Sequence, residues 1–445
     1  MISHIRAFLR SEGVGRHLVR GSLASFFVQG AGAGLLFLSE VLLARVLGAE
    51  NYGLYATISA WQQVLLIAVL IGSSSLLLRF VPIYVEASDW PKLRGLVRYC
   101  SRVSVALGFS LLLIAALVLA GVSDYVSDDA QLGYLIAMAI LPIAALSIQR
   151  QAILRALHKV LLALMPEYIV RPIMLMMLVA MLAWVLDVDM RVPVVLAASG
   201  VAAVVAFLLG RYWMRQVMPA QVASAPTATE GSTWFRIATP LFLIAAVQLL
   251  IVRLDIILLG ALTGHEQAGH YAAASRIADL VVFALASANV VVAPLIAGLH
   301  ARNDIPGMQA MFVTLAKGVS LATIPLAALI TLGGQAILGF FGNGYEAAYL
   351  PLLILACGQI VNALSGPVDF VMAMTGQQMK MLQILAAAAG LNLALNLLLI
   401  PMLGLAGAAI ATACTTTFWN LYMRRVVRRR LGVDPSVMVL LRKCG

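Results

Sequence analysis

Charged residues are scarce in this 445-residue chain, and their scarcity excludes a soluble globular protein. Only 11% of the residues are charged and 62% are hydrophobic, whereas soluble domains carry about one quarter charged residues. Twelve apolar stretches approach or exceed the roughly 20 residues that cross a bilayer. Their cores are residues 22–44, 54–78, 101–121, 132–149, 160–185, 192–211, 237–262, 270–297, 312–333, 347–373, 381–401 and 404–423. The sequence therefore predicts an all-α integral membrane protein with about 12 transmembrane helices.

Cysteine and long polar loops are also scarce. The four cysteines, Cys100, Cys357, Cys414 and Cys444, show no paired spacing, so neither a disulfide framework nor a metal site is predicted. The histidines fall at span ends or in loops, and no cofactor is indicated. Because the connections are too short for a catalytic domain, we predict that the chain is not an enzyme and handles its substrate inside the membrane.

Basic residues are nearly absent from one side of the predicted membrane. Of the 30 Lys and Arg residues, 25 fall at the termini or in the even-numbered connections, two in the odd-numbered connections and three within spans. This asymmetry predicts a multi-pass protein of the inner (plasma) membrane with both termini in the cytoplasm. Contact with anionic lipid headgroups accounts for the net charge of +11, so no nucleic-acid partner is expected.

Two short stretches, residues 48–56 and 264–272, echo each other 216 positions apart and match at five of nine positions. Each copy closes the first span of its half. We interpret it as a helix-ending turn, in which glycine supplies unusual backbone angles or allows close approach. A repeat in a membrane chain indicates a transporter with two related halves, here two pseudo-symmetric six-helix lobes in parallel orientation. The predicted parts are a cytoplasmic amphipathic segment (1–21), an N-terminal lobe (22–211), a cytoplasmic linker (212–236), a C-terminal lobe (237–423) and a basic cytoplasmic tail (424–445).

Three longer motifs carry a family resemblance: residues 43–55, residues 253–271 and residues 392–411. In order and spacing, they resemble the polysaccharide exporters and oligosaccharide-lipid flippases of the multidrug/oligosaccharidyl-lipid/polysaccharide (MOP) superfamily. The resemblance implies a MATE-like fold and the movement of polyprenyl-diphosphate-linked oligosaccharide to the outer leaflet, for lipopolysaccharide or exopolysaccharide biosynthesis. It also implies polysaccharide-assembly proteins as candidate partners.

Three arginines lie within predicted spans, where a charge costs at least about 2.5 kcal/mol. Arg253 and Arg171 lie deep in spans seven and five, and Arg276 is shallower in span eight. Since guanidinium binds phosphate oxygens in a bidentate way, we predict that these arginines bind the diphosphate. The alternative is helical ion pairing, of Arg171 with Glu167 and of Arg276 with Asp279.

Arg253 has no such partner in its own helix, since Asp255 is two residues away and points to another face. Arg253 is therefore the strongest substrate-binding candidate. Arg79 and Arg150 lie at the cytoplasmic ends of spans two and four. We expect them to extend to the interface or, secondarily, to form an entrance site for the substrate.

Acidic residues in spans are candidates for coupling to a proton or sodium gradient. Glu40 has no charged neighbour in the first span, and Asp255 and Asp369 are the other candidates. A buried carboxyl favours its neutral form, which suits proton transport. The alternative is a hydrogen-bonded carboxylate that takes no part in coupling.

Amide side chains form two further candidate stripes. Gln359 and Asn362 share a helical face with Asp369, and Asn392 and Asn396 lie four residues apart. They are predicted to line a polar passage for the glycan. Hydrogen bonding between helices is the alternative.

The sequence thus predicts alternating access between two lobes around a cationic cavity. Two other functions remain open. A multidrug-type, ion-coupled exporter of the same superfamily would share the fold. An integral-membrane glycan polymerase or ligase would ordinarily need a sizeable outer loop, and none is evident.

Overall fold

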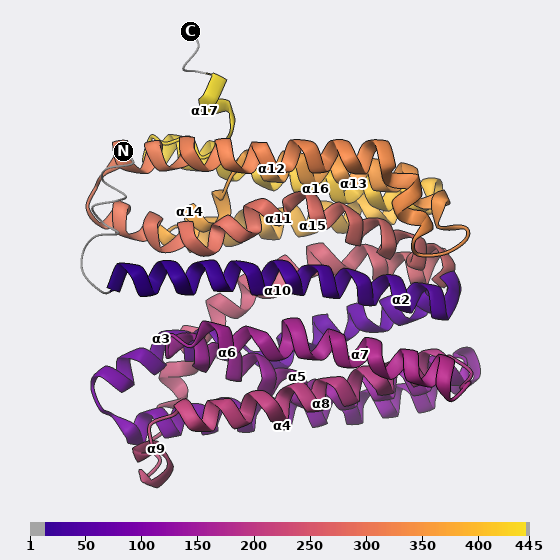
Figure 1. Cartoon of the computed structure of the whole chain (residues 1–445), viewed down its shortest axis with the longest axis horizontal. Coiled ribbons are helices and arrows are strands. Elements are labelled where there is room, and N and C mark those ends of the chain that lie inside the picture. Colours follow the sequence, from indigo (N-terminus) through magenta and orange to yellow (C-terminus); the bar gives the residue numbers. More distant parts are fainter. Residues whose placement is uncertain (1–13, 442–445) are drawn as a thin grey trace. The chain divides into compact units, whose positions relative to one another are not determined.

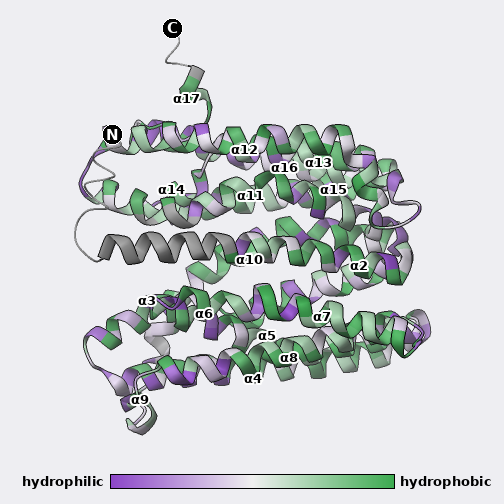
Figure 2. Ribbon diagram, viewed as in Figure 1, coloured by the Kyte–Doolittle hydropathy of each residue, from purple (hydrophilic) through white to green (hydrophobic). Residues whose placement is uncertain are grey.

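The computed structural model describes residues 14–441, and every regular element among them is a helix (Figure 1). Residues 1–13, most of the predicted amphipathic segment, lie outside the described residues, as do residues 442–445 of the predicted tail. The long helices are mostly apolar along their length (Figure 2). The prediction of an all-α membrane protein is confirmed.

Ten helical segments in the described part of the chain are long and apolar enough to cross a membrane. The first candidate, Val28–Leu70, contains two predicted spans because α2 (Val14–Leu70) continues past a kink at Gly48. The last predicted span lies in α16 (Leu405–Leu431), which runs on into arginines. Counting α2 twice and adding α16 accounts for the twelve predicted crossings.

The chain forms two compact units, each with its own apolar core. Of the described residues, the first contains 14–39 and 65–242, and the second contains 40–64 and 243–441. Residues 40–64, which we expected in the N-terminal lobe, therefore pack with the second unit. Helices also occupy both ends of the predicted linker at 212–236, since α8 runs to Val217 and α10 begins at Gly231.

The fifth predicted span, residues 160–185, lies in the first unit and is not a continuous α-helix. It begins with a short α-helix, and a wider π-helical turn starts at Pro166, which has no backbone N–H to continue the ordinary ladder. In the core of this unit, the fully buried Trp234 donates a hydrogen bond to the Tyr84 hydroxyl, 3.2 Å away. The elements of this unit between residues 65 and 230 are α3 (Ser73–Glu86), α4 (Trp90–Gly121), η1 (Ser123–Tyr125), α5 (Asp128–Ala156), α6 (Val160–Met165), η2 (Pro166–Val170), α7 (Arg171–Ala180), η3 (Met181–Val185), α8 (Val192–Val217) and α9 (Gln221–Ser224).

The tenth predicted span, in the second unit, is also broken. It ends as an α-helix at Ser365, because Gly366 has a φ of 74° and Pro367 follows, and a short helix then restarts. We had predicted that Asp369 shares a helical face with Gln359 and Asn362. The break at Gly366 places Asp369 in a different helix, so this prediction is wrong. The elements of this unit that follow α2 begin with α10 (Gly231–Leu262), whose residues up to 242 belong to the first unit. The others are α11 (His265–Ala301), α12 (Ile305–Gly339), η4 (Tyr345–Ala348), α13 (Tyr349–Ser365), α14 (Val368–Met374), α15 (Gln378–Leu403), α16 and α17 (Met438–Leu441).

A loop after α16 folds back onto the second unit around Asp434. This carboxylate accepts hydrogen bonds from Arg424 Nε (3.0 Å) and Nη2 (2.8 Å) and from the Ser436 hydroxyl (2.7 Å). Burial alone would raise the pKa of Asp434, but these hydrogen bonds outweigh it and lower the pKa. The contact therefore stabilises the fold fully above the unfolded pKa of about 3.9, and this stabilisation is lost as the pH falls through the lower folded pKa.

The two copies of the internal repeat pack against each other within the second unit. Gly48 and Gly264 adopt φ angles of 73° and 97°, as predicted for turns that need glycine. A side chain on Gly53 would collide with the carbonyl oxygen of His265, and one on Gly269 would collide with that of Ala49. These two contacts are equivalent under the 216-residue offset, so the repeat forms a reciprocal contact. This packing explains why residues 40–64 belong to the second unit.

We predict that Gly53→Ala lowers the free energy of unfolding by about 1–3 kcal/mol, the usual cost of overpacking. The obstructing atoms are backbone atoms, which cannot rotate away. Thermal unfolding of the purified protein measures the effect. Gly390→Ala in α15 is the matched control, because no atom lies within 4 Å of the added methyl group. Equal melting temperatures for the two variants would contradict the close-contact interpretation.

Candidate functional site

Arg253 lies on α10, nine residues before its last residue, Leu262, or about 14 Å deep at the helical rise of 1.5 Å per residue. Its half-buried guanidinium donates from Nε to the Gln63 side-chain oxygen, 3.0 Å away. Among the residues that the structure describes, no carboxylate forms a direct ion pair with it. Arg253 is thus a deep cation held by one neutral amide.

Arg276 on α11 is paired, but with a different partner from the one expected. Its Nη2 atom lies 3.0 Å from Glu40 Oε1, and the Tyr52 hydroxyl donates to Glu40 Oε2 at 2.9 Å. Glu40 has no charged neighbour in its own span, but the segment after the kink at Gly48 brings Tyr52 to it and α11 brings Arg276. Asp279, the expected partner of Arg276, interacts electrostatically with both Arg276 and Arg253.

A chain of amides continues from Asp279 of α11 through α13 and α16. Gln359 donates to Asp279 Oδ1 at 3.1 Å, Asn362 donates to Gln359 Oε1 at 3.1 Å, and Asn420 donates to Asn362 Oδ1 at 3.2 Å. Gln359 and Asn362 are partly exposed, as a passage lining requires, and Asn420 is buried. Sequence reasoning missed Asn420 because it stands alone in the apolar part of α16. We call the group of Arg253, Gln63, Arg276, Glu40, Tyr52, Asp279, Gln359 and Asn362 the Arg253 network.

Asp255 lies in a separate cage of hydrogen-bond donors. Tyr271 donates at 2.7 Å, Asn396 at 2.7 Å and Asn392 at 3.4 Å, and Thr412 donates as well. Asp255 is 2% exposed, and both asparagines are fully buried. We had predicted that Asn392 and Asn396 line a passage. They are instead buried and connect α15 to α10 through Asp255. Tyr271 and Thr412 were missed, although Tyr271 belongs to the internal repeat.

In the first unit, Glu167 lies between two arginines. It is 3.4 Å from Arg171, as predicted for an (i, i+4) pair, and 3.4 Å from Arg150 of α5. Arg150 is 2% exposed, so the expectation that it extends to the interface is wrong. Its guanidinium occupies the space that a side chain on Gly210 of α8 would fill. One carboxylate is thus shared by two cations, and Arg171 keeps a partly exposed side chain.

The two remaining candidates stand apart from these groups. Arg79 is exposed, and its guanidinium lies 5.7 Å from the centre of the Phe80 ring. This position fits a cation at the membrane interface. Asp369 is half-buried in the first turn of α14.

Long membrane-spanning helices around deep, mostly paired charges define an all-α integral membrane protein. Residues 18–300, more than half of the chain, match the family described as "Polysaccharide biosynthesis protein". The chain belongs to this family. A comparison with curated proteins finds no significant match.

Solved structures of the MOP superfamily share the fold. An inward-facing multidrug resistance MATE family transporter gives a TM-score of 0.73 at 13% identity, covering 90% of this chain and 94% of that one. The lipid II flippase MurJ, in an inward closed conformation, gives 0.69 at 17% identity, covering 95% and 91%. A MOP superfamily transporter from Pyrococcus furiosus, described as having a binding pocket of reverse polarity, gives 0.67 at 14% identity, covering 94% and 95%.

We predict that Glu167→Gln destabilises the protein by about 3–5 kcal/mol, because it leaves the Arg150 charge buried without its counterion. Thermal unfolding in detergent measures the loss. The control is Asp129→Asn, which breaks an exposed pair with Arg191 and should cost no more than about 1 kcal/mol. Equal losses in the two variants would show that the Glu167 pairing has no special weight.

Proposed function

We propose that this protein flips polyprenyl-diphosphate-linked oligosaccharide from the cytoplasmic to the outer leaflet of the inner membrane by alternating access. The observation that carries the proposal is Arg253, a deep and half-buried arginine whose partner in the structure is a neutral amide. A diphosphate would supply a direct ionic partner for this guanidinium, which forms no ion pair in the described chain. The family match to polysaccharide biosynthesis proteins supports the same substrate class.

Guanidinium suits this task because it stays charged when desolvated and presents parallel N–H donors to phosphate oxygens. Hydrogen bonds to a charged group contribute about 1.5–3 kcal/mol each. In the proposal, Arg253 makes the principal contact. Arg276 and Arg171 are secondary, because each already has a carboxylate partner.

The amides beside Arg253 supply a place for the sugar. Gln359 and Asn362 are partly exposed and belong to the same network. Amides both donate and accept hydrogen bonds, as sugar hydroxyls require of a polar lining. Under this proposal the prenyl chain remains in the lipid, and MurJ, described as a lipid II flippase, offers a parallel on the same fold.

Glu40 is the best candidate for coupling to a proton or sodium gradient. It is partly exposed and contacts Arg276 within the Arg253 network. Asp255, by contrast, is sealed by four donors, which assigns it a structural role in this proposal. The strong excess of basic residues in the even-numbered connections and at the termini supports an inner-membrane protein with cytoplasmic termini.

We predict that Arg253→Ala reduces export of the glycan at least about tenfold, in line with the loss of one charged hydrogen bond, while Arg253→Lys retains part of it. Lipid-linked single repeat units should accumulate on the cytoplasmic leaflet. The assay compares surface polysaccharide and the leaflet distribution of these units in cells that lack the native protein and express each variant at equal levels.

Arg98→Ala is the control, because Arg98 is exposed on α4 and belongs to no proposed site. Normal export by Arg253→Ala would refute the proposed role of the arginine. In cells that lack the protein, accumulation on the outer leaflet would indicate a polymerase or ligase instead of a flippase. Loss of drug resistance with intact glycan export would indicate a multidrug exporter.

A further inference from the structure

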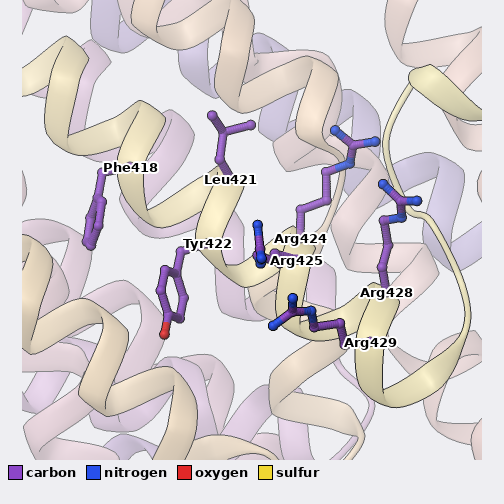
Figure 3. A pocket seen from close by; sticks show the side chains of 7 residues that line it. All are labelled: Phe418, Leu421, Tyr422, Arg424, Arg425, Arg428 and Arg429. Carbon is purple, nitrogen blue, oxygen red and sulfur yellow. The ribbon is translucent and has the colours of Figure 1, made fainter.

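A pocket of about 730 Å³ lies along the C-terminal part of α16 (Figure 3). Among the residues that the structure describes, one helix supplies the lining side chains. They are Phe418, Leu421, Tyr422, Arg424, Arg425, Arg428 and Arg429. None of them belongs to the Arg253 network, so the pocket is a separate feature of the second unit.

The lining changes from apolar to cationic along the helix. Phe418, Tyr422, Arg425 and Arg429 recur at spacings of four, three and four residues, which place them on one face. The two aromatic rings lie 6.0 Å apart, and both are exposed. The order matches a phospholipid at the membrane surface, where acyl chains give way to a phosphate, and aromatic residues favour this interface.

Two of the four arginines are already engaged by the loop that follows α16. Asp434 lies 2.8 Å from Arg424 Nη2 and 3.5 Å from Arg428 Nε. It is fixed in turn by Gln309, whose side-chain oxygen accepts a hydrogen bond from the Asp434 backbone N–H at 2.8 Å. Arg425 and Arg429 form no ion pair with any residue of the described chain. Arg425 and Arg429 are exposed and therefore available to a ligand.

We propose that this pocket binds an anionic phospholipid, with Arg425 and Arg429 on its phosphate and with Phe418, Leu421 and Tyr422 along its acyl chains. Arginine and phosphate form charge-assisted hydrogen bonds, and basic clusters that directly follow a membrane helix bind anionic lipids. The apolar part of the lining favours a lipid over a free phosphate ion. A phosphate ion alone would leave Phe418, Leu421 and Tyr422 without a partner.

Native mass spectrometry of the purified full-length protein tests the proposal, with phosphatidylglycerol and phosphatidylcholine as probes. Since one basic residue near a membrane surface contributes about fivefold to anionic lipid binding, the double variant Arg425→Gln/Arg429→Gln should bind phosphatidylglycerol about 25-fold more weakly. Its affinity for phosphatidylcholine should stay unchanged. Thermal unfolding of each variant confirms that it is folded.

Arg430→Gln is the matched control, since Arg430 is exposed on the same helix but does not line the pocket. Its affinity for phosphatidylglycerol should stay within about twofold of the wild-type value, well below the fivefold effect of one lining arginine. A loss equal to that of a lining arginine would overturn the proposal in favour of diffuse charge attraction. Undiminished binding by the double variant would overturn it as well.

The aromatic residues separate a lipid from a free anion. Phe418→Ala/Tyr422→Ala should weaken phosphatidylglycerol binding, and inorganic phosphate should compete poorly with the lipid. If phosphate binds as tightly as phosphatidylglycerol and the aromatic variant binds the lipid normally, the ligand is a free anion and the phospholipid proposal is wrong.

Discussion

A charge inside hydrocarbon needs a partner, and this requirement organises both units. In the first unit, Glu167 forms ion pairs with Arg150 and Arg171, and Gly210 leaves the space that Arg150 occupies. In the second unit, Glu40 forms an ion pair with Arg276, and four hydrogen-bond donors surround Asp255. Several glycines, tyrosines and asparagines therefore have a role that the sequence alone does not reveal. They make room for a buried charge or donate a hydrogen bond to it. Arg253 departs from this pattern, since a neutral amide holds it, and this difference makes it the centre of the proposed site.

The internal repeat contributes to this arrangement in both halves of the sequence. In each half, a tyrosine that follows the glycine turn donates a hydrogen bond to a carboxylate in the helix before it. Tyr52 binds Glu40, and Tyr271 binds Asp255. The tyrosines are not equivalent positions of the repeat, because Tyr271 corresponds to Tyr55. The two carboxylates also differ in setting: Glu40 reaches Arg276, whereas Asp255 is enclosed. The halves therefore share a way of holding a carboxylate, and they differ in what that carboxylate can do.

The sequence was sufficient to predict features that depend on local spacing. The helical spans, the glycine turns at Gly48 and Gly264 and the Glu167–Arg171 pair follow from composition, repeat position and (i, i+4) geometry. Contacts between distant segments could not be predicted in this way. Glu40 looked isolated because Arg276 lies in another helix. Asn392 and Asn396 were placed in a passage because an apolar helix has no polar face to show which side is buried. The interruption at Gly366–Pro367, by contrast, was visible in the sequence, and the stripe through Asp369 should have ended there.

The contacts of Arg276 suggest how substrate and ion binding would be linked in the proposed mechanism. Arg276 lies 3.0 Å from Glu40, and Asp279 interacts electrostatically with both Arg276 and Arg253. A diphosphate at Arg253 would add negative charge beside these two carboxylates, and Arg276 would be drawn toward it at the expense of Glu40. Glu40 would then need another cation, which a proton or sodium ion can supply. If the diphosphate strengthens ion binding at Glu40 by some factor, linkage requires that the ion strengthens diphosphate binding by that same factor. Such coupling requires a carboxylate with a cationic partner, which Glu40 has and the enclosed Asp255 lacks.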